Sequence, residues 1–133
     1  MDSNQNNALI KTNSGLVNLL ASQTLNLNVL LKDIIVLETK VAGTMFYEPE
    51  EFEPLLQINT VLKLLREPEN PHDKFAIALL FENAKIGYIP RSQNEVIARL
   101  MDAGKEFTAT VRNKQWYENS NELKIEIEIS MKG

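Results

Sequence analysis

The sequence predicts a mainly β domain of the α+β class: a small, partly closed barrel of about six short strands with one or two helices, preceded by a helical N-terminal extension. Residues 107–112 and 123–132 alternate apolar and polar side chains, which is typical of strands with one solvated face. Two further apolar runs, 61–65 and 75–81, are bounded by turn residues, and residues 92–104 have helical spacing. This pattern favours a barrel that curls to protect its edges, and a flat two-layer α+β sheet is the alternative.

Length and composition narrow the classes of protein. The 133 residues predict a leader over 1–32 and one domain over 33–133. The absence of cysteine excludes disulfides and thiolate metal sites, and it fits a cytoplasmic location. No apolar run approaches the roughly 20 residues that span a bilayer, so no membrane association is expected. The net charge of −4 argues against non-specific binding to long duplex DNA, whose affinity comes mainly from phosphate neutralisation.

The leader is rich in asparagine and leucine. After a polar start, residues 16–21 place apolar side chains at roughly helical spacing, which predicts a short amphipathic helix. This helix either packs on the same molecule or serves as a handle for self-association or for a partner protein.

The first half of the domain alternates strands with irregular, proline-bearing segments. Residues 33–43 and 61–65 indicate strands. The acidic segment 48–54 indicates a solvated loop, because its two prolines rule out a central strand. A second break covers residues 66–73, where Asn70 and Asp73 are able to bond local amides. This break is either a plain tight turn or a rigid turn that places side chains accurately.

The second half begins with a hairpin. The apolar run 75–81 and the segment 85–89 are joined by a short polar turn, which predicts a buried strand pair. A helix follows, with Ser92 and Glu95 as a capping box and Gly104 as the C-terminal stop. The apolar face predicted for this helix consists of Val96, Ile97, Leu100 and Met101.

Catalytic chemistry is poorly represented. His72 is the only histidine, and its acidic neighbours Glu69 and Asp73 are too few to complete a metal site. Ser92 and Ser130 have structural explanations, as a helix cap and on a solvated strand face. The five glycines are scattered, so no phosphate-binding loop exists. The sequence therefore predicts no catalytic residue, no metal and no cofactor.

Several short motifs occur in a fixed order. They are Val41-Ala42-Gly43-Thr44 with Phe46-Tyr47, Arg66-Glu67-Pro68-x-Asn70-Pro71-x-Asp73, Ala76-Ile77, Ile86-Gly87-Tyr88-Ile89-Pro90 and the helical residues 97–104. In this order and spacing the chain resembles the HIRAN domain family over about residues 33 to 112. The resemblance implies an OB-like or SH3-like β-barrel with helices, which agrees with the barrel predicted above. The length leaves no room for an ATPase, so the resemblance is to the stand-alone bacterial or phage members.

The resemblance also implies a function, because the HIRAN domain of one eukaryotic DNA-repair ATPase captures the 3′ end of single-stranded DNA. Phe46 and Tyr47 would stack on the terminal bases, although core packing is the alternative for both rings. Asp73 would accept a hydrogen bond from the terminal 3′-hydroxyl and would reject a phosphate. The other implied nucleic-acid-binding residues line the pocket or contact backbone phosphates: Asn70, His72 and Tyr88 for the pocket, and Lys85 and Arg91 for the phosphates.

Three functions follow from these observations. The first is a non-catalytic module that binds single-stranded nucleic-acid ends, with DNA as the expected ligand, in DNA repair or processing. The second is a protein-interaction adaptor that keeps the fold but has lost DNA binding. Its motivation is the net acidity, the leader over 1–32, and Met45, which stands where a DNA-binding relative has an arginine. The third is an unrecognised hydrolase acting on nucleic acid.

Overall fold

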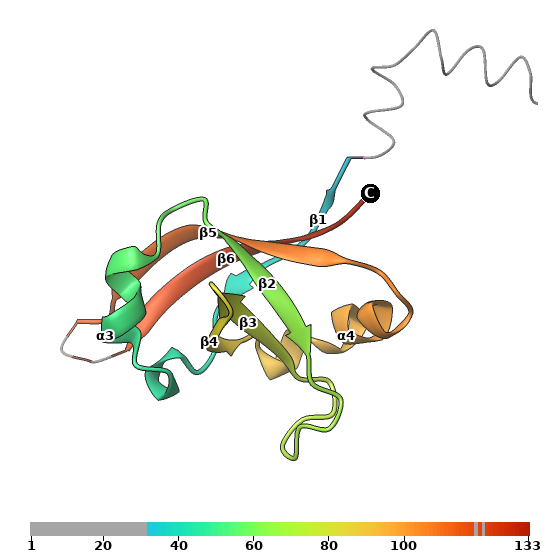
Figure 1. Cartoon of the computed structure of the whole chain (residues 1–133), viewed down its shortest axis with the longest axis horizontal. Helices are drawn as coiled ribbons and strands as arrows, with labels where there is room; N and C mark the ends of the chain where they lie inside the picture. The colour runs from blue at the N-terminus through green and yellow to red at the C-terminus, as the bar shows by residue number, and fades with distance from the viewer. Residues whose placement is uncertain (1–31, 119, 121) are drawn as a thin grey trace, which may run out of the picture. The chain divides into compact units, whose positions relative to one another are not determined.

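A computed structural model of the chain describes residues 32–118, 120 and 122–133 (Figure 1). Asp33–Lys132 belong to one compact unit. Within the described residues the strands are β1 (Ile34–Lys40), β2 (Val61–Arg66), β3 (Ile77–Phe81), β4 (Ala84–Tyr88), β5 (Phe107–Trp116) and β6 (Leu123–Met131). The helices there are α3 (Pro49–Phe52) and α4 (Glu95–Asp102), with the short 3₁₀ helices η1 (Thr44–Phe46), η2 (Glu53–Leu55) and η3 (Arg91–Gln93).

All these strands belong to one antiparallel sheet with the order β1-β6-β5-β2-β3-β4. The long strands β5 and β6 run together across the molecule, and β2, β3 and β4 continue the sheet from them (Figure 1). Irregular register in β1–β6 and β5–β6 bends the sheet, as bulges do. The predicted mainly β fold of about six strands, with one helix between β4 and β5, is confirmed.

The edges of the curled sheet meet at a single point. Ala42, just after β1, forms an isolated antiparallel bridge with Tyr88 at the end of β4. Ala42 N donates to Tyr88 O at 2.8 Å, and Tyr88 N donates to Ala42 O at 2.9 Å. Gly87 permits this approach, because a Cβ there would lie 2.6 Å from Ala42 O and would overlap the Val41 side chain. We call the Ala42–Tyr88 bridge the seam. It joins the β1 and β4 edges of the sheet, which are not paired along their length.

The hydrophobic core follows the alternation in the sequence. In β6 every second residue from Leu123 to Ile129 is buried, and in β5 the same holds from Phe107 to Val111. The strand β3 is buried on both faces, as its unbroken apolar run predicts. The apolar residues Ile34 and Ile35 are exposed at the start of the edge strand β1, where they pair with the end of β6.

The acidic segment 48–54 is helical from Pro49 onward, so the prediction of a loop is wrong, whereas most of its side chains are exposed to solvent as predicted. Pro49 occupies the first turn of α3 and is buried, and two glutamates follow it. Proline fits this position because the first N–H groups of a helix have no partner inside it, and acidic side chains favour the positive helix end. Lys114 of β5 holds the segment in place, with its Nζ 2.8 Å from Glu53 Oε2.

The helix α4 begins after the predicted start, and the capping box of Ser92 and Glu95 is wrong. Ser92 lies in η3, where Gln93 N donates to Pro90 O at 2.9 Å. The residue that precedes α4 is Asn94, and its side chain makes no cap hydrogen bond. The turn that Pro90 begins therefore occupies the residues that the capping box assigns to the helix.

The buried face of α4 also differs by one residue. Ile97 is buried, and Leu100 and Met101, three and four residues further on, pack against the core. Val96 is 68% exposed, contrary to its predicted place on the apolar face. Successive residues of a helix are rotated by about 100°, so Val96 and Ile97 point in different directions.

Several predictions lie outside the described residues. The helix over 16–21 and its role in self-association or partner binding are among them, and the domain boundary at residues 32 and 33 stays a prediction. Within the described ranges, no helix is long and apolar enough to cross a bilayer. The cytoplasmic location also stays a prediction.

Candidate nucleic-acid interface

One open cavity brings together most of the residues predicted to bind nucleic acid. It has a volume of about 340 Å³ and lies between η1, the turn after β2 and the end of β4. Seven of the eight predicted residues line it: Phe46, Tyr47, Asn70, His72, Asp73, Tyr88 and Arg91. Lys85 does not line it. We call this space the Phe46–Asp73 cavity.

The first wall of the cavity is η1, which holds Phe46 in solvent. Gly43, just before η1, has a left-handed φ of 76°, which glycine adopts without steric cost. Thr44 is buried, and its Oγ1 donates to Leu123 O at 2.8 Å, which ties η1 to the start of β6. The Phe46 side chain is 79% exposed beside this anchor. Core packing is therefore excluded as the explanation of Phe46.

Tyr47 and Tyr88 lie next to each other along the cavity. Their ring centroids are 6.2 Å apart, and the ring planes are inclined by 53°, within the range of favourable tilted aromatic pairs. Tyr88 is held in place by the seam with Ala42. The seam therefore brings together aromatic residues from two distant segments of the chain.

The second wall is the Asn-Pro turn between β2 and β3. Asn70 Oδ1 accepts hydrogen bonds from the backbone N of His72 at 2.8 Å and of Asp73 at 3.2 Å. Asn70 Nδ2 donates to Glu67 Oε1 at 3.0 Å. An asparagine that bonds amides two and three residues ahead stabilises a turn in place of a backbone carbonyl. Asn70 thus shapes the wall, in agreement with the tight-turn interpretation.

Asp73 supports local structure while it lines the cavity. Its Oδ1 accepts from Phe75 N at 2.9 Å, and its Oδ2 accepts from Asn94 Nδ2 at 2.7 Å. Asn94 is 2% exposed, and its part in the site was not predicted, because an asparagine directly before a helix indicates only an N-cap. A carboxylate offers roughly four lone-pair sites, so the two protein bonds leave capacity for a ligand.

Lys85, which was predicted to contact phosphates, is already paired within the protein. Its Nζ lies 2.6 Å from Glu67 Oε2 and 2.9 Å from Tyr88 Oη, and Tyr88 Oη donates to Glu67 Oε1 at 2.8 Å. The Glu67 carboxylate offsets the charge that a phosphate contact would use. No role was predicted for Glu67, and its place in the Arg66–Asp73 motif was the available signal.

The Glu67–Lys85–Tyr88 cluster perturbs the pKa of each member. Burial opposes ionisation of Glu67, but hydrogen bonds from Lys85, Asn70 and Tyr88 outweigh it and hold the Glu67 pKa below its ordinary value. The hydrogen bond to Glu67 raises the pKa of Lys85, and burial raises the pKa of Tyr88. At neutral pH the cluster therefore holds one carboxylate, one ammonium and a protonated phenol.

Arg91 and His72 are the cavity residues best placed to meet a ligand. Both are exposed, and neither side chain makes a hydrogen bond or ion pair with a described residue. A guanidinium without a protein partner offers several N–H donors to phosphate oxygens. In the part of the chain that the structure describes, no cluster of three or more His, Asp or Glu residues is arranged to hold a metal ion.

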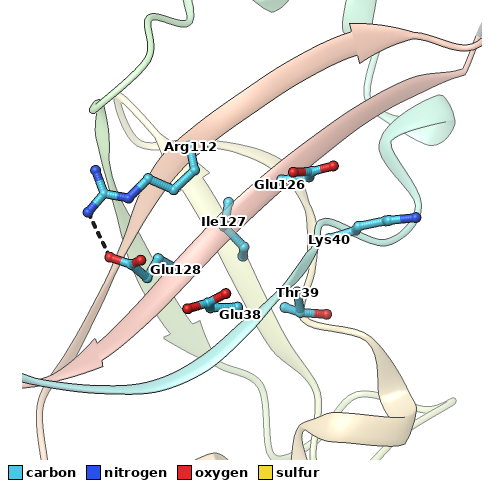
Figure 2. A pocket seen from close by; sticks show the side chains of 7 residues that line it. All are labelled: Glu38, Thr39, Lys40, Arg112, Glu126, Ile127 and Glu128. Carbon is cyan, nitrogen blue, oxygen red and sulfur yellow. Dashed lines mark hydrogen bonds and ion pairs between the residues drawn. The ribbon is translucent and has the colours of Figure 1, made fainter.

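A second hollow, of about 250 Å³, is lined by residues of β1, β5 and β6 (Figure 2). Glu38 and Glu128 are cross-strand neighbours there, and Arg112 Nη2 lies 2.6 Å from Glu128 Oε1 (Figure 2). Glu126 adds a third carboxylate, opposite Lys40 in the register of the strands. Three carboxylates against two cations give this hollow a negative field, which disfavours phosphate.

Comparison with known proteins decides the family. The family model of the HIRAN domain matches residues 34–132. The chain belongs to the HIRAN domain family. The match includes every strand and helix described above, so the HIRAN domain contains both walls of the Phe46–Asp73 cavity.

Solved structures share this HIRAN fold. A crystal structure of a protein from Lactobacillus plantarum is similar with a TM-score of 0.66 and 24% identity, covering 77% of this chain and 98% of that one. The HIRAN domain of human HLTF has a TM-score of 0.58 and 22% identity, covering 73% of this chain and 74% of that one. At these identities the likeness establishes the fold alone.

A longer relative is similar in sequence. The Fanconi-associated nuclease 1 homolog of Oryza sativa subsp. japonica is 35% identical over 72 residues. These residues are 51% of this chain and 7% of that protein. The HIRAN chain thus spans a small part of that relative, and the name of the relative applies to the longer protein.

Proposed function

We propose that this HIRAN domain captures the 3′ end of single-stranded DNA in the Phe46–Asp73 cavity, in DNA repair or processing, and without catalysis of its own. One observation carries the proposal: an exposed aromatic ring, a partly buried carboxylate and an exposed guanidinium line the same open cavity. HIRAN domains are DNA-binding modules, which supports the class of ligand.

Phe46 supplies a stacking surface for a base. Its ring is fixed at the backbone by η1 and is open to solvent, so a base reaches it without displacing core side chains. Stacking of a base on an aromatic ring contributes about 1–3 kcal/mol and tolerates any base. Tyr47 and Tyr88 continue the aromatic surface further along the cavity.

Asp73 gives the preference for an end. A terminal 3′-hydroxyl donates a hydrogen bond to a free lone pair of the carboxylate. At an internal nucleotide the same oxygen carries a phosphate, which the Asp73 charge repels. Asn94 and the Phe75 amide hold the carboxylate in one orientation, so little flexibility is lost on binding.

Arg91 is the proposed phosphate ligand, because its guanidinium makes no contact within the described residues that a phosphate would have to displace. Lys85 is proposed to position Tyr88 instead, since Glu67 already neutralises its ammonium. The proposal assigns no cofactor or metal to the cavity.

Fluorescence anisotropy with oligothymidylates that carry an internal fluorophore tests the proposal. We expect the strand with a 3′-hydroxyl to bind about tenfold or more tightly than a 3′-phosphorylated or circular strand, because a like-charge contact with Asp73 costs several kcal/mol. Asp73→Asn should abolish this preference and keep the fold, since Asn94 is able to turn its amide oxygen toward the new amide. Ser92→Ala, which changes an exposed residue that lines neither the cavity nor the core, is the matched control.

The possible results separate the functions. Equal affinity for all three strands contradicts end capture. The absence of binding to any strand favours the adaptor function, and cleavage of the labelled strand in the presence of divalent metal favours the hydrolase.

A further inference from the structure

We infer that the captured strand leaves the Phe46–Asp73 cavity through one particular exit, in which Lys74, Arg91 and Arg99 bind the phosphates on the 5′ side of the terminal nucleotide. The inference rests on the proposed function and adds to it the path and direction of the bound strand. Three observations support it: a continuous wall, an aromatic support for the cations, and the charge of the alternative exit.

The wall is continuous because a second cavity adjoins the first. This cavity has a volume of about 440 Å³ and shares Asn70, His72, Asp73 and Arg91 with the Phe46–Asp73 cavity. Phe75 lines it as well, and we call it the Phe75 cavity. Because these residues line both cavities, a strand whose last nucleotide occupies the first cavity reaches the second by passing His72 and Arg91.

Phe75 holds two cations over its ring. Lys74 Nζ lies 5.2 Å from the ring centroid, and Arg99 Cζ lies 5.0 Å from it. The ring itself packs against the hydrophobic core, so its position is fixed. A cation–π contact orients an ammonium or guanidinium without using all of its N–H donors, which stay available to phosphate.

Arg99 also pairs with Glu95, at 2.9 Å between Nη2 and Oε2. Both side chains of this pair are more than half exposed, so water screens it and a phosphate is able to compete for the guanidinium. The Lys74 ammonium has no ion-pair partner among the described residues.

The alternative exit is a third cavity, of about 530 Å³, which shares Asn70 and Tyr88 with the Phe46–Asp73 cavity. Its charged lining consists of Glu67, Glu69 and Lys85, which gives a net charge of −1. The charged lining of the Phe75 cavity, Lys74 and Arg91 with Asp73 and Glu95, has no net charge, and the Arg99 guanidinium adds a positive charge beside it, over the Phe75 ring. Each nucleotide of the strand carries a negative charge, so the Phe75 cavity is the favoured exit.

A length series tests the inference. Oligothymidylates of two to eight nucleotides with a free 3′-hydroxyl are titrated into the whole chain, the wild type beside the double variant Lys74→Ala/Arg99→Ala. The matched control is Lys63→Ala/Lys105→Ala, which removes the same charge from exposed positions outside the three cavities. Melting temperatures confirm that every variant is folded.

We expect the wild-type affinity to rise with length and the Lys74/Arg99 variant to lose most of that rise. The loss is about fivefold for the octanucleotide at low salt, as for two exposed ion pairs, and negligible for the dinucleotide. The slope of log affinity against log salt for the octanucleotide falls by about 0.7 for each phosphate that the variant no longer neutralises. The control variant keeps the rise with length.

Two results overturn the inference. One is an unchanged octanucleotide affinity in the Lys74/Arg99 variant, and the other is an equal loss at all lengths, which would place these cations at the end itself. A pair of charge reversals decides between the exits: Lys74→Glu should weaken octanucleotide binding more than Glu69→Lys strengthens it, and the reverse order contradicts the path. The proposed function is judged separately, by the wild-type preference for a 3′-hydroxyl over a 3′-phosphate.

Discussion

Asn94 Nδ2 donates a hydrogen bond of 2.7 Å to Asp73 Oδ2, and the donor is almost fully buried. Asn94 stands at the start of α4, whereas Asp73 closes the Asn-Pro turn and lines the Phe46–Asp73 cavity. This single bond therefore links the helix to the carboxylate that is proposed to read the DNA end. The orientation of Asp73 depends on the position of α4 as well as on the turn.

Asn94→Ala is expected to lower the free energy of unfolding by about 1–3 kcal/mol, because it removes a donor from a partly buried carboxylate. Urea denaturation measures this change. Ser92→Ala serves as the control and should change stability by less than about 0.5 kcal/mol, since Ser92 is exposed and caps no helix. If Ser92→Ala lowered the free energy of unfolding by about 1 kcal/mol or more, the result would support the predicted capping box and contradict the observed start of α4.

Phe46→Ala should weaken binding of a single strand by about 1–3 kcal/mol and leave the unfolding free energy unchanged. The reason is that the ring is exposed and contributes little to the core. Anisotropy and thermal melting measure the two quantities. Val96→Ala, which removes an exposed apolar side chain from α4, should alter neither. A large loss of stability in Phe46→Ala would show that the ring is structural.

Gly87→Ala should destabilise the domain by about 1–3 kcal/mol and also weaken DNA binding, because the new Cβ would collide with Ala42 O and the Val41 side chain. Gly104→Ala is the matched control. Gly104 has a positive φ but open space around its Cβ position, so the same substitution there should cost about 1 kcal/mol and leave DNA binding intact. Equal effects of the two substitutions on binding would argue against the seam as the element that shapes the cavity.

The pH dependence of stability should report on Glu67. Its pKa in the folded protein lies below the ordinary value of 4.5, so the stabilisation by its ionised form is complete above that value and is lost as the pH falls through the lowered pKa. The difference in unfolding free energy between the wild type and Glu67→Gln should therefore be largest near neutral pH and should shrink in acid. Urea denaturation of both proteins, repeated at steps of about one pH unit between pH 3 and pH 8, measures this difference in unfolding free energy.

Glu69→Gln is the control for this experiment, because Glu69 is exposed and has no hydrogen bond or ion pair to a described residue. Its difference from the wild type should stay flat over the same range. A Glu67→Gln difference that grows as the pH falls would contradict the sign of the pKa shift.

The strands that could be predicted from the sequence are those whose burial follows a local pattern. In β6 the alternation from Leu123 to Ile129 matches the burial observed, because one face of the strand contacts the core and the other contacts water. The exposure of Ile34 and Ile35 could not be predicted, because it depends on which residues of distant strands pack over the start of β1. The start of α4 was missed because the turn at Pro90 competes with the capping box.

In the candidate site, too, the local features could be predicted from the sequence and the contacts between distant segments could not. The turn chemistry of Asn70 and Asp73 is local and was predicted. The convergence of Phe46 with Asp73 was expected from the family resemblance alone, since no residue spacing implies it. The pairing of Lys85 with Glu67 could not be predicted, because the two residues lie in different segments and meet only once β2, β3 and β4 have paired. Whether these residues bind nucleic acid stays a prediction.

The seam has a consequence for the dynamics of the domain. The segment after β1 is joined to the end of β4 by two backbone hydrogen bonds, which the amides of Ala42 and Tyr88 donate. A brief local opening at these amides would widen the gap between the two walls while β5 and β6 remain paired. The rate at which these two amides exchange with deuterium therefore reports how firmly a ligand is bound. A ligand that contacts both walls should slow exchange at Ala42 and Tyr88 and leave exchange in the interior of the sheet unchanged.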